Sequence, residues 1–387
     1  MTDRCTLVFT GDVGFDRYMD GRWEDDALIS DEVLAFLHSA DHVITNVEGP
    51  LVAQPANTAT EGAQQLKHTM NPAAVRVFKR MHADIWNLCN NHIMDAGAEG
   101  LRCSLQEAAK AGVQTIGAGM DLEAARRPLI LDEAGGIGLF GVGYQRACRK
   151  ASETEAGCLS WSDMDTIRDT IHEIKARCRW CVVVSHGGEE FTALPSPYTR
   201  ERYLQYLDMG ADLVVCLHPH VPMNYELVGE KAIFYSLGNF IFDTPYQRSQ
   251  YHTEEGVVLK LCFTPENYSF EACGIRILRG EERVVKGELP VIFRNVPAQE
   301  YELLAPLAAK MFIAATKRQQ IYMNPARFSD ATDEAWREHF LEPKRSGRVP
   351  GEALDFYILL PLAAEEEKQA WRQSSLDDVK EYILQQM

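Results

Sequence analysis

Apolar and polar positions follow two different periods along roughly the first 220 residues of the chain. Short β-rich runs alternate with stretches in which apolar residues recur at helical spacing. The runs predict strands at residues 5–10, 42–47, 84–89, 113–116, 128–131, 138–142, 181–184 and 213–216. The helical stretches lie at 31–39, from 72 onward, at 98–111 and at 163–177. This alternation is typical of an α/β fold.

After residue 220 the alternation stops. Four β-rich runs follow one another and predict antiparallel strands, at 223–227, 232–235, 256–263 and 269–278. We therefore expect an α/β domain at residues 1–295, two-sheeted or four-layered, with a mixed sheet closed by hairpins. The composition changes near Val296, which predicts a helical C-terminal extension over 296–387. Within it we expect a helix at 300–317, a linker broken by Pro and Gly at 343–351, and a final helix opened by Ser375 and Asp378.

Residues with metal-binding side chains directly follow several of the predicted strands. These residues are Asp12, Glu48, Asn91, His92, His186, His218 and His220. Ligands of open α/β sheets bind at the carboxyl edge, where strand-end loops share a crevice. One such aspartate is most often a helix cap and one such histidine a structural group, but seven at successive strand ends favour a functional site. Carboxylates, imidazoles and an amide oxygen together suit Mn, Fe or Zn.

Six short motifs carry a resemblance to a known family. They are Gly11-Asp12, Asn46-Val-Glu48-Gly, Asn90-Asn91-His92-Ile-Met-Asp95, Ser185-His186-Gly-Gly-Glu-Glu190, His218-Pro-His220 and Tyr235-Ser-Leu-Gly-Asn239-Phe. Over roughly residues 5–245 the chain resembles the bacterial capsule-synthesis CapA family, which is associated with poly-γ-glutamate production. That family belongs to the calcineurin-like metallophosphoesterase fold. The resemblance therefore implies a two-sheet, four-layer α/β sandwich.

The resemblance also implies a role for each strand-end residue. Glu48 would bridge two divalent metal ions, with Asn91, His186 and His218 completing one site and Asp12 and His220 completing the other. His92 would be the general acid and would bind no metal. This set is chemically coherent, because two-metal sites activate a water and clamp the attacking and leaving oxygens. A nearby imidazole can then protonate the departing oxygen.

The chain departs from the family pattern at two positions. Gly14 stands where the wider phosphoesterase pattern has a histidine, which leaves one site a ligand short. We therefore expect two metal ions bound with unequal affinity. Gly187 follows the histidine of the fourth motif, where relatives mostly carry a tryptophan that could help shape the substrate pocket.

Three further polar residues lie close to the motifs. Asp95 is expected to cap a helix or to orient His92, rather than to bind metal. Glu190 either supports the metal ligands or contacts the substrate, or it is only an exposed acidic residue of a loop. Asn239 either lines the cleft or serves the loop structure. A basic set forms either an anion-binding patch or an ordinary solvated surface: Arg146, Arg149, Lys150, Arg200 and Arg202.

Composition limits the classes of partner and the compartment. The 387 residues carry a formal net charge of −17, which disfavours nucleic acid and anionic membrane surfaces as partners. Ten cysteines lie without regular spacing and mostly in apolar surroundings, as expected for buried thiols in a reducing compartment. Cys178 and Cys181 have the spacing of a redox or zinc pair, but no second pair accompanies them. No signal peptide or membrane span is predicted, although most relatives begin with a membrane anchor, so we expect a cytoplasmic protein.

Two functions remain open on the sequence, and a third interpretation, a metal-free structural relative, would require all the ligand residues to be idle. The first is a metal-dependent, phosphoesterase-like hydrolase acting on an anionic substrate, either a phosphoester or a γ-glutamyl chain. The second is a non-catalytic, metal-stabilised accessory protein that binds poly-γ-glutamate or a similar polyanion. The absent histidine at position 14 favours the second, and the presence of His92, which a structural metal site would not need, favours the first.

Overall fold

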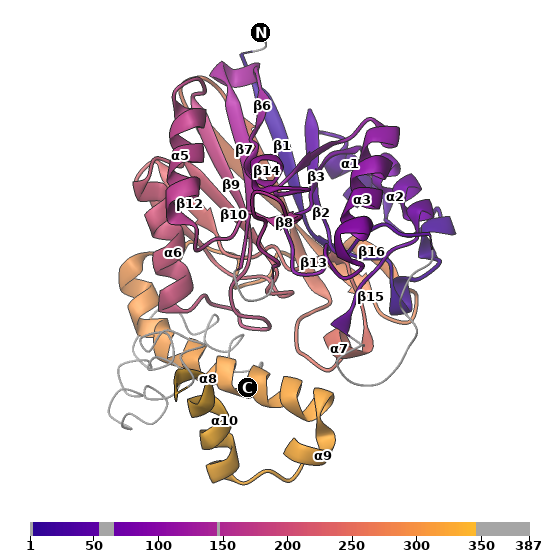
Figure 1. Cartoon of the computed structure of the whole chain (residues 1–387), viewed down its shortest axis with the longest axis vertical. Coiled ribbons are helices and arrows are strands. Elements are labelled where there is room, and N and C mark those ends of the chain that lie inside the picture. Colours follow the sequence, from indigo (N-terminus) through magenta and orange to yellow (C-terminus); the bar gives the residue numbers. More distant parts are fainter. Residues whose placement is uncertain (1–2, 54–65, 145–147, 346–387) are drawn as a thin grey trace.

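A computed structural model describes residues 3–53, 66–144 and 148–345. Two β-sheets pack face to face, and helices cover both outer sides (Figure 1). In spatial order, the first sheet contains β16 (Arg283–Lys286), β15 (Tyr268–Leu278), β14 (Glu255–Phe263), β1 (Cys5–Val13), β2 (His42–Val47), β3 (Ala83–Asn87) and β4 (Gln114–Ile116), with β13 (Asn239–Ile241) also paired to β1. The second contains β11 (Tyr225–Val228), β12 (Lys231–Phe234), β10 (Leu213–Leu217), β9 (Trp180–His186), β7 (Ile137–Gly143) and β6 (Leu129–Leu131). The predicted two-sheet, four-layer α/β architecture is confirmed.

The helices form the two outer layers and the C-terminal part. Those packed on the first sheet are α1 (Asp31–Leu37), α2 (Val75–Arg80) and α3 (Gly97–Ala111). Those packed on the second are α5 (Met164–Lys175) and α6 (Pro197–Asp208). Two short helices, α4 (Leu122–Arg126) and α7 (Pro245–Arg248), lie in connections, and a two-stranded pair is formed by β5 (Ala118–Gly119) and β8 (Gly157–Cys158). The C-terminal helices are α8 (Ala298–Met323), α9 (Pro325–Phe328) and α10 (Asp333–Arg345).

Three apolar cores hold the layers together, because alternate residues of each strand point to opposite faces. In β9, Val182 and Val184 pack between the two sheets, whereas Val183 packs against α5 and α6. The inter-sheet core is completed by residues such as Phe9 and Phe234. Burial on both faces explains why these strands are continuous apolar runs in the sequence.

Strand direction brings the carboxyl ends of the central strands to one edge of each sheet. β1, β2, β3 and β4 are parallel neighbours, and so are β7, β9, β10 and β12. The later strands are antiparallel in the pairs β14–β15 and β11–β12, as predicted, but β12 also pairs parallel with β10. The loops that carry the predicted site residues therefore meet at this edge.

Several element boundaries differ from the prediction. β3 ends at Asn87 instead of residue 89, while β9 runs on through His186. Helix α6 was not predicted, because its buried face is built mainly from Tyr203 and Tyr206 instead of aliphatic residues. Its capping signal is nevertheless present, since the Ser196 side chain accepts a hydrogen bond from the Thr199 N–H before a first-turn proline.

The C-terminal helix α8 packs against the main fold. Its residues Leu304, Leu307 and Met311 share one apolar cluster with Leu194 and Ile292. The predicted helix at 300–317 is confirmed and is longer than expected. Helix α10 continues through residue 345, into the segment predicted as a linker. The rest of that segment and the predicted final helix lie outside the described residues, and the boundary at 295/296 stays a prediction.

The cysteines and the helices can be compared with the expectations for buried thiols and for membrane spans. All ten cysteines are free, and eight of them are buried, as predicted for small apolar residues. Among the helices in the described part of the chain, none combines the length and the apolar character needed to cross a membrane.

Candidate metal centre

The predicted ligands converge where the carboxyl edges of the two sheets meet. Asp12 lies near the end of β1, Glu48 follows β2, and His186 is the last residue of β9. His218 and His220 follow β10. All five side chains are buried, although each is polar or charged. Burying ionisable groups without a partner costs several kcal/mol, so such a cluster indicates a shared charged ligand.

One group of potential ligands comprises Asp12, Glu48 and His186, whose ligand atoms lie within 4.8 Å of one another. The Asn46 amide donates hydrogen bonds to Asp12 Oδ1 (2.8 Å) and Glu48 Oε2 (3.3 Å). His186 Nδ1 lies 3.9 Å from Asp12 Oδ1, too far for a hydrogen bond. Asn46 therefore orients both carboxylates, and this residue was not among the predicted site residues.

A second group comprises Glu190, His218 and His220, again within 4.8 Å of one another. Glu190 Oε1 lies 3.8 Å from His218 Nε2. His218 and His220 both adopt positive φ angles, of 99° and 62°, which non-glycine residues rarely do. Such strained conformations persist where the surroundings impose them, as at ligand-binding turns.

The Glu48 carboxylate joins the two groups. Its Oε1 atom lies 3.8 Å from His186 Nε2 and 3.8 Å from His220 Nε2. This buried oxygen has no hydrogen-bond partner in the structure. A buried oxygen without a partner, flanked by two imidazole nitrogens beyond hydrogen-bond distance, has the arrangement of an atom shared between two cations. The donor set present therefore fits divalent metal ions.

The electrostatics of the cluster favour a metal ion over a proton. Burial lowers the pKa of His186 and of His218, and the neighbouring histidines lower both further. Both rings are therefore neutral, which is the form that binds metal. Burial, followed by the charge of Asp12, raises the pKa of Glu48. Buried carboxylates that repel each other in this way are relieved by a divalent cation.

The side chain of Asn91 also reaches this centre. Its Oδ1 accepts a hydrogen bond from His186 Nε2 at 2.8 Å. The two predicted ligand atoms thus face each other, and a cation binding between them would replace this hydrogen bond. The resemblance places His186 and His218 in the same metal site with Asn91. In the structure, His186 groups with Asp12 and Glu48, whereas His218 groups with Glu190 and His220, so the assignment of ligands to each site stays a prediction.

His92 lies beside the cluster and forms a pair with Asp95. Its Nδ1 atom is 2.7 Å from Asp95 Oδ2, so Nε2 is the ring nitrogen left to exchange a proton. Burial lowers the pKa of His92 to about 4. Of the roles expected for Asp95, the structure shows the orienting one, because Ala96 occupies the N-cap of α3.

Asn239 orients His220. Its Oδ1 lies 2.9 Å from His220 Nδ1, and its amide donates to Gln247 Oε1 and to the Thr253 carbonyl. His220 Nδ1 also lies 3.3 Å from Asp12 Oδ2. Burial lowers the pKa of His220, but the hydrogen bond with Asp12 and the nearby carboxylates outweigh this effect and raise it.

A pocket of about 220 Å³ opens beside this centre. Glu190 stands at its wall and accepts hydrogen bonds from Gln319 Nε2 (2.8 Å) and from the Tyr246 hydroxyl (3.4 Å). The structure therefore favours a Glu190 that supports the ligands or contacts the substrate. It does not favour an exposed acidic residue of a loop. The pocket is lined by Leu66, His68, Asn91, His92, Glu190, His220, Tyr246, Gln247, Gln319 and Met323.

The comparisons with known proteins agree with this geometry. Residues 6–244 match the family model described as bacterial capsule synthesis protein PGA_cap. The chain is 30% identical over 274 residues to the PGA biosynthesis protein CapA of Bacillus subtilis, covering 68% of this chain and 71% of that protein. This chain belongs to the PGA_cap family.

Two further relatives are similar at lower identity. The capsule biosynthesis protein CapA of Bacillus anthracis is 26% identical over 281 residues, with 68% of each chain covered. A probable polyglutamine synthesis accessory protein of Mycobacterium tuberculosis is 26% identical over 197 residues, covering 46% of this chain and 50% of the relative. The fold is consistent with the calcineurin-like superfamily implied by the motifs.

This PGA_cap protein has glycine at positions 14 and 187, where the family resemblance implies larger side chains. Side chains from other segments occupy the space next to both glycines. Phe242 occupies the space beside Gly14 and stacks on His220. The Cβ of Tyr144 and the ring of Trp161 lie against Gly187, and the two aromatic rings meet edge to face, 4.5 Å between centroids. Aromatic side chains are therefore present at both places, although they come from other segments of the chain.

Several pocket residues of this PGA_cap protein were not predicted from the sequence. His68 accompanies His92, with ring centroids 4.2 Å apart, and its Nδ1 lies 2.6 Å from Asp16 Oδ2. In the sequence it follows a polar stretch instead of an apolar run, so no strand-end signal marks it. Gln319 and Met323 lie on α8, beyond the family match at residues 6–244, and only packing brings them here.

Three of the five predicted basic residues contact other side chains of the fold. Arg200 makes two hydrogen bonds to Glu226, at 2.8 and 2.6 Å, and Lys150 pairs with Asp163 at 3.1 Å. Arg202 contacts Met164 and Tyr198, and Arg146 lies outside the described residues. Arg200 therefore has a structural partner, and the pocket draws its polar groups from other residues.

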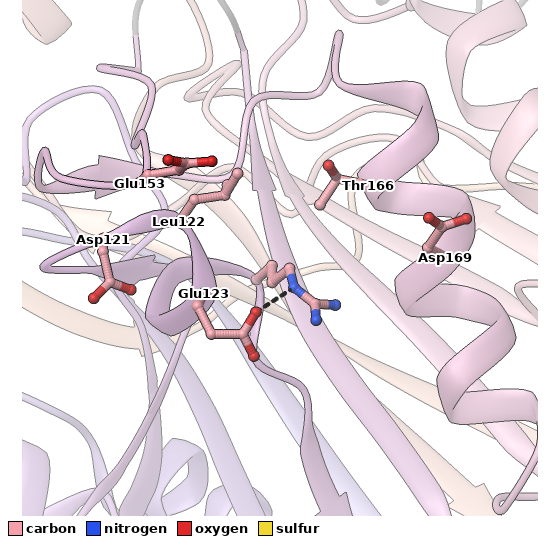
Figure 2. A pocket seen from close by; sticks show the side chains of 7 residues that line it. Asp121, Leu122, Glu123, Glu153, Thr166 and Asp169 are labelled. Carbon is pink, nitrogen blue, oxygen red and sulfur yellow. Dashed lines mark hydrogen bonds and ion pairs between the residues drawn. The ribbon is translucent and has the colours of Figure 1, made fainter.

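A second hollow, of about 410 Å³, lies between α4 and α5 on the outer side of the second sheet (Figure 2). Its lining is dominated by carboxylates, and its only cation, Arg126, is paired with Glu123 at 2.8 Å. Neither a histidine nor a cysteine is among its lining residues. It therefore lacks the groups for the chemistry described above.

Proposed function

We propose that this PGA_cap protein is a metal-dependent hydrolase that uses two divalent cations to cleave an anionic substrate. The observation that carries the proposal is the buried Glu48 Oε1, which has no partner and lies 3.8 Å from both His186 Nε2 and His220 Nε2. Relatives are named for PGA and capsule biosynthesis, which favours a γ-glutamyl chain as the substrate class. A phosphoester is the alternative substrate implied by the fold.

In the proposed reaction, different residues of this chain would bind the cations and transfer the proton. Asp12, Glu48, Asn91, His186, His218 and His220 would hold the cations, of which Mn, Fe and Zn suit the donor set. Bound there, two cations would activate a water and polarise the scissile group. Because its lowered pKa leaves His92 Nε2 without a proton at neutral pH, this nitrogen would first take the proton released by the attacking water and then give it to the departing group, while Asp95 holds the ring through Nδ1.

The pocket wall supports substrate binding next to this chemistry. Its lining offers amide and hydroxyl groups from Gln247, Gln319 and Tyr246, together with the ring of His68. Such groups can pair with the amide and carboxylate groups of a γ-glutamyl chain without a cluster of free cations. The pairing of Arg200 and Lys150 with carboxylates is compatible with an anionic substrate, because bound cations would supply the positive charge.

The test combines metal analysis with a substrate screen. Purified protein is dialysed, assayed for bound metals, and supplied with Mn before incubation with a poly-γ-glutamate oligomer, a phosphodiester and a phosphomonoester. We expect metal-dependent cleavage of one of them, lost in Glu48→Gln and kept in the exposed control Glu271→Gln. Finding no bound metal under any loading condition, or cleavage that survives Glu48→Gln, would overturn the proposal.

One observation favours a second function, that of a metal-stabilised accessory protein without turnover. Phe242 fills the place beside Gly14 where the wider family has a ligand, so the second cation is held by fewer protein groups. Two of the relatives are themselves named as accessory proteins. Metal content and poly-γ-glutamate binding without cleavage of any of the three substrates would establish this second function in place of the first.

A further inference from the structure

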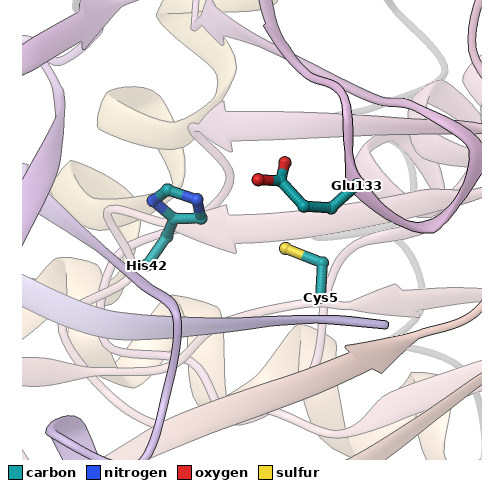
Figure 3. A group of neighbouring side chains, drawn as sticks. All are labelled: Cys5, His42 and Glu133. Carbon is teal, nitrogen blue, oxygen red and sulfur yellow. The ribbon is translucent and has the colours of Figure 1, made fainter. Parts of the chain in front are cut away.

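Three residues with metal-binding side chains meet at the edge of the sheets opposite the metal centre. Cys5 is the first residue of β1 and His42 the first of β2, so both lie at the amino ends of parallel strands. Glu133 lies in the 3-10 turn Glu133–Gly135, which connects β6 and β7 of the other sheet. Figure 3 shows the His42 ring, the Glu133 carboxylate and the Cys5 sulfur arranged around a common space.

The spacing of these side chains suits a cation. Their ligand atoms all lie within 4.8 Å of one another. Ligand atoms bound to a tetrahedral zinc, at Zn–S of about 2.3 Å and Zn–N or Zn–O of about 2.0–2.1 Å, are roughly 3.5 Å apart. The difference needs only a small shift of the Glu133 side chain, which is partly exposed.

A carboxylate already orients the histidine. His42 Nδ1 lies 2.6 Å from Asp84 Oδ2, which leaves Nε2 as the ring atom available to the cluster. Asp84 is itself fixed, because its other oxygen accepts a hydrogen bond from the Val43 N–H at 2.9 Å. A histidine whose second nitrogen bonds a carboxylate is the usual arrangement behind a zinc ligand.

The thiol experiences a negative field that a cation would relieve. Burial, together with the charges of Asp41, Glu133 and Asp84, raises the pKa of Cys5 to about 12. The simpler interpretation is that Cys5 is only part of the inter-sheet core, to which it does belong. Core packing alone, however, does not require a histidine and a glutamate at the polar end of the thiol.

We propose that Cys5, His42 and Glu133 form a zinc site that ties the two sheets together at this edge. Thiolate, imidazole and carboxylate are a donor set that favours zinc among the common cations, with water as a fourth ligand. Binding converts the Cys5 thiol to a thiolate, and the proton passes to the buffer. Affinity therefore rises with pH until the thiol proton no longer competes.

Cobalt substitution separates this site from the metal centre. The predicted ligands at the metal centre are nitrogen and oxygen atoms, so a thiolate-to-cobalt charge-transfer band would report on a cysteine ligand alone. Full-length protein stripped with a chelator is titrated with Co²⁺, and we expect such a band, abolished by excess Zn²⁺. It should persist in Asp12→Asn, which alters the other centre, and in Cys262→Ser, a cysteine of β14 that pairs with Thr6 and therefore points to the opposite face of the sheet from Cys5.

Two variants decide the outcome. Cys5→Ser should abolish the band, and Glu133→Gln should retain it with Co²⁺ affinity weakened about 10-fold or more, the scale on which metal-site groups act. Glu133 is partly exposed, so its variant remains informative if Cys5→Ser fails to fold. Absence of the band in the wild type, or a band unchanged in both variants, would overturn the zinc site while leaving the proposed hydrolase untouched.

Discussion

The ring of Phe242 lies where a side chain at position 14 would extend. A Cβ atom on Gly14 would come within 2.6 Å of the Phe242 ring. The same ring stacks on His220, with centroids 5.0 Å apart and planes inclined by 10°. Phe191 stacks on His220 as well, at 5.8 Å and 24°. Position 14 therefore offers no metal ligand, and the rings of Phe242 and Phe191 instead hold the predicted ligand His220 in place.

This relationship predicts how the weaker cation site can be repaired. Gly14→His alone should overpack against Phe242 and lower the free energy of unfolding by about 1–3 kcal/mol. Gly14→His combined with Phe242→Ala should fit and should tighten the weaker of two Mn²⁺ sites by at least about 10-fold, which is about 1.4 kcal/mol.

Isothermal titration with Mn²⁺ measures the effect, with Phe242→Ala alone as the control. That single variant loosens His220 without adding a ligand, so it should bind Mn²⁺ no better than the wild type. Two equal, fully occupied metals in dialysed wild-type protein would contradict the expected asymmetry.

A second prediction concerns His92. His92→Ala should lower turnover by about 10²–10⁴-fold, the usual contribution of a positioned acid, while leaving metal content unchanged. The reason is that His92 contacts Asp95 and lines the pocket but is not among the residues grouped as ligands. Turnover assays and elemental analysis on the same preparations check both halves. Metal loss together with activity would make His92 a ligand instead.

A third prediction concerns the contact between α8 and the pocket. Gln319→Ala removes the 2.8 Å hydrogen bond to Glu190 Oε2, so Glu190 should lose its orientation toward His218. Metal affinity should fall by about 10–100-fold, as it does when groups supporting ligands are removed. The neighbouring Gln320→Ala is the matched control and should titrate like the wild type. Equal metal affinity in both variants would show that Glu190 does not act on the cations.

A fourth prediction concerns the glycine before Asp12. A Cβ on Gly11 would lie 2.0 Å from the Gly238 carbonyl oxygen, which accepts the Asp12 N–H at 3.1 Å. Gly11→Ala should therefore push β1 and β13 apart, cost about 1–3 kcal/mol in unfolding free energy, and weaken metal binding. Gly21→Ala serves as the comparison, since its positive φ of 75° makes it strained but its surroundings are open. It should lose stability without losing metal, as read by denaturant unfolding and Mn²⁺ titration.

Much of the fold followed from the sequence because both sheets are buried on two faces. Continuous apolar runs therefore marked the central strands, and the polar residues after them marked the site. His186 and His218 could be assigned to one edge on this basis, and the structure brings them within 4.8 Å ring to ring. Helix α6 escaped prediction because tyrosines form its buried face.

The remaining pocket residues could not be predicted because their positions depend on tertiary packing. Gln319 lies 129 residues after Glu190, and no local periodicity links them. His68 reaches the pocket through its contacts with Asp16 and Phe242, which come from distant segments. Likewise, Gly14 indicated a lost ligand, but only the structure shows that Phe242 fills the space.

The path of α8 has a consequence for comparing members of the family. The predicted cation ligands all lie within residues 6–244, whereas Gln319 and Met323 come from a helix beyond that region. Relatives that share every ligand can thus differ in the wall that a substrate meets. Chimeras that exchange only the segment after residue 296 would then transfer preference for chain length or end group while leaving the reaction type unchanged.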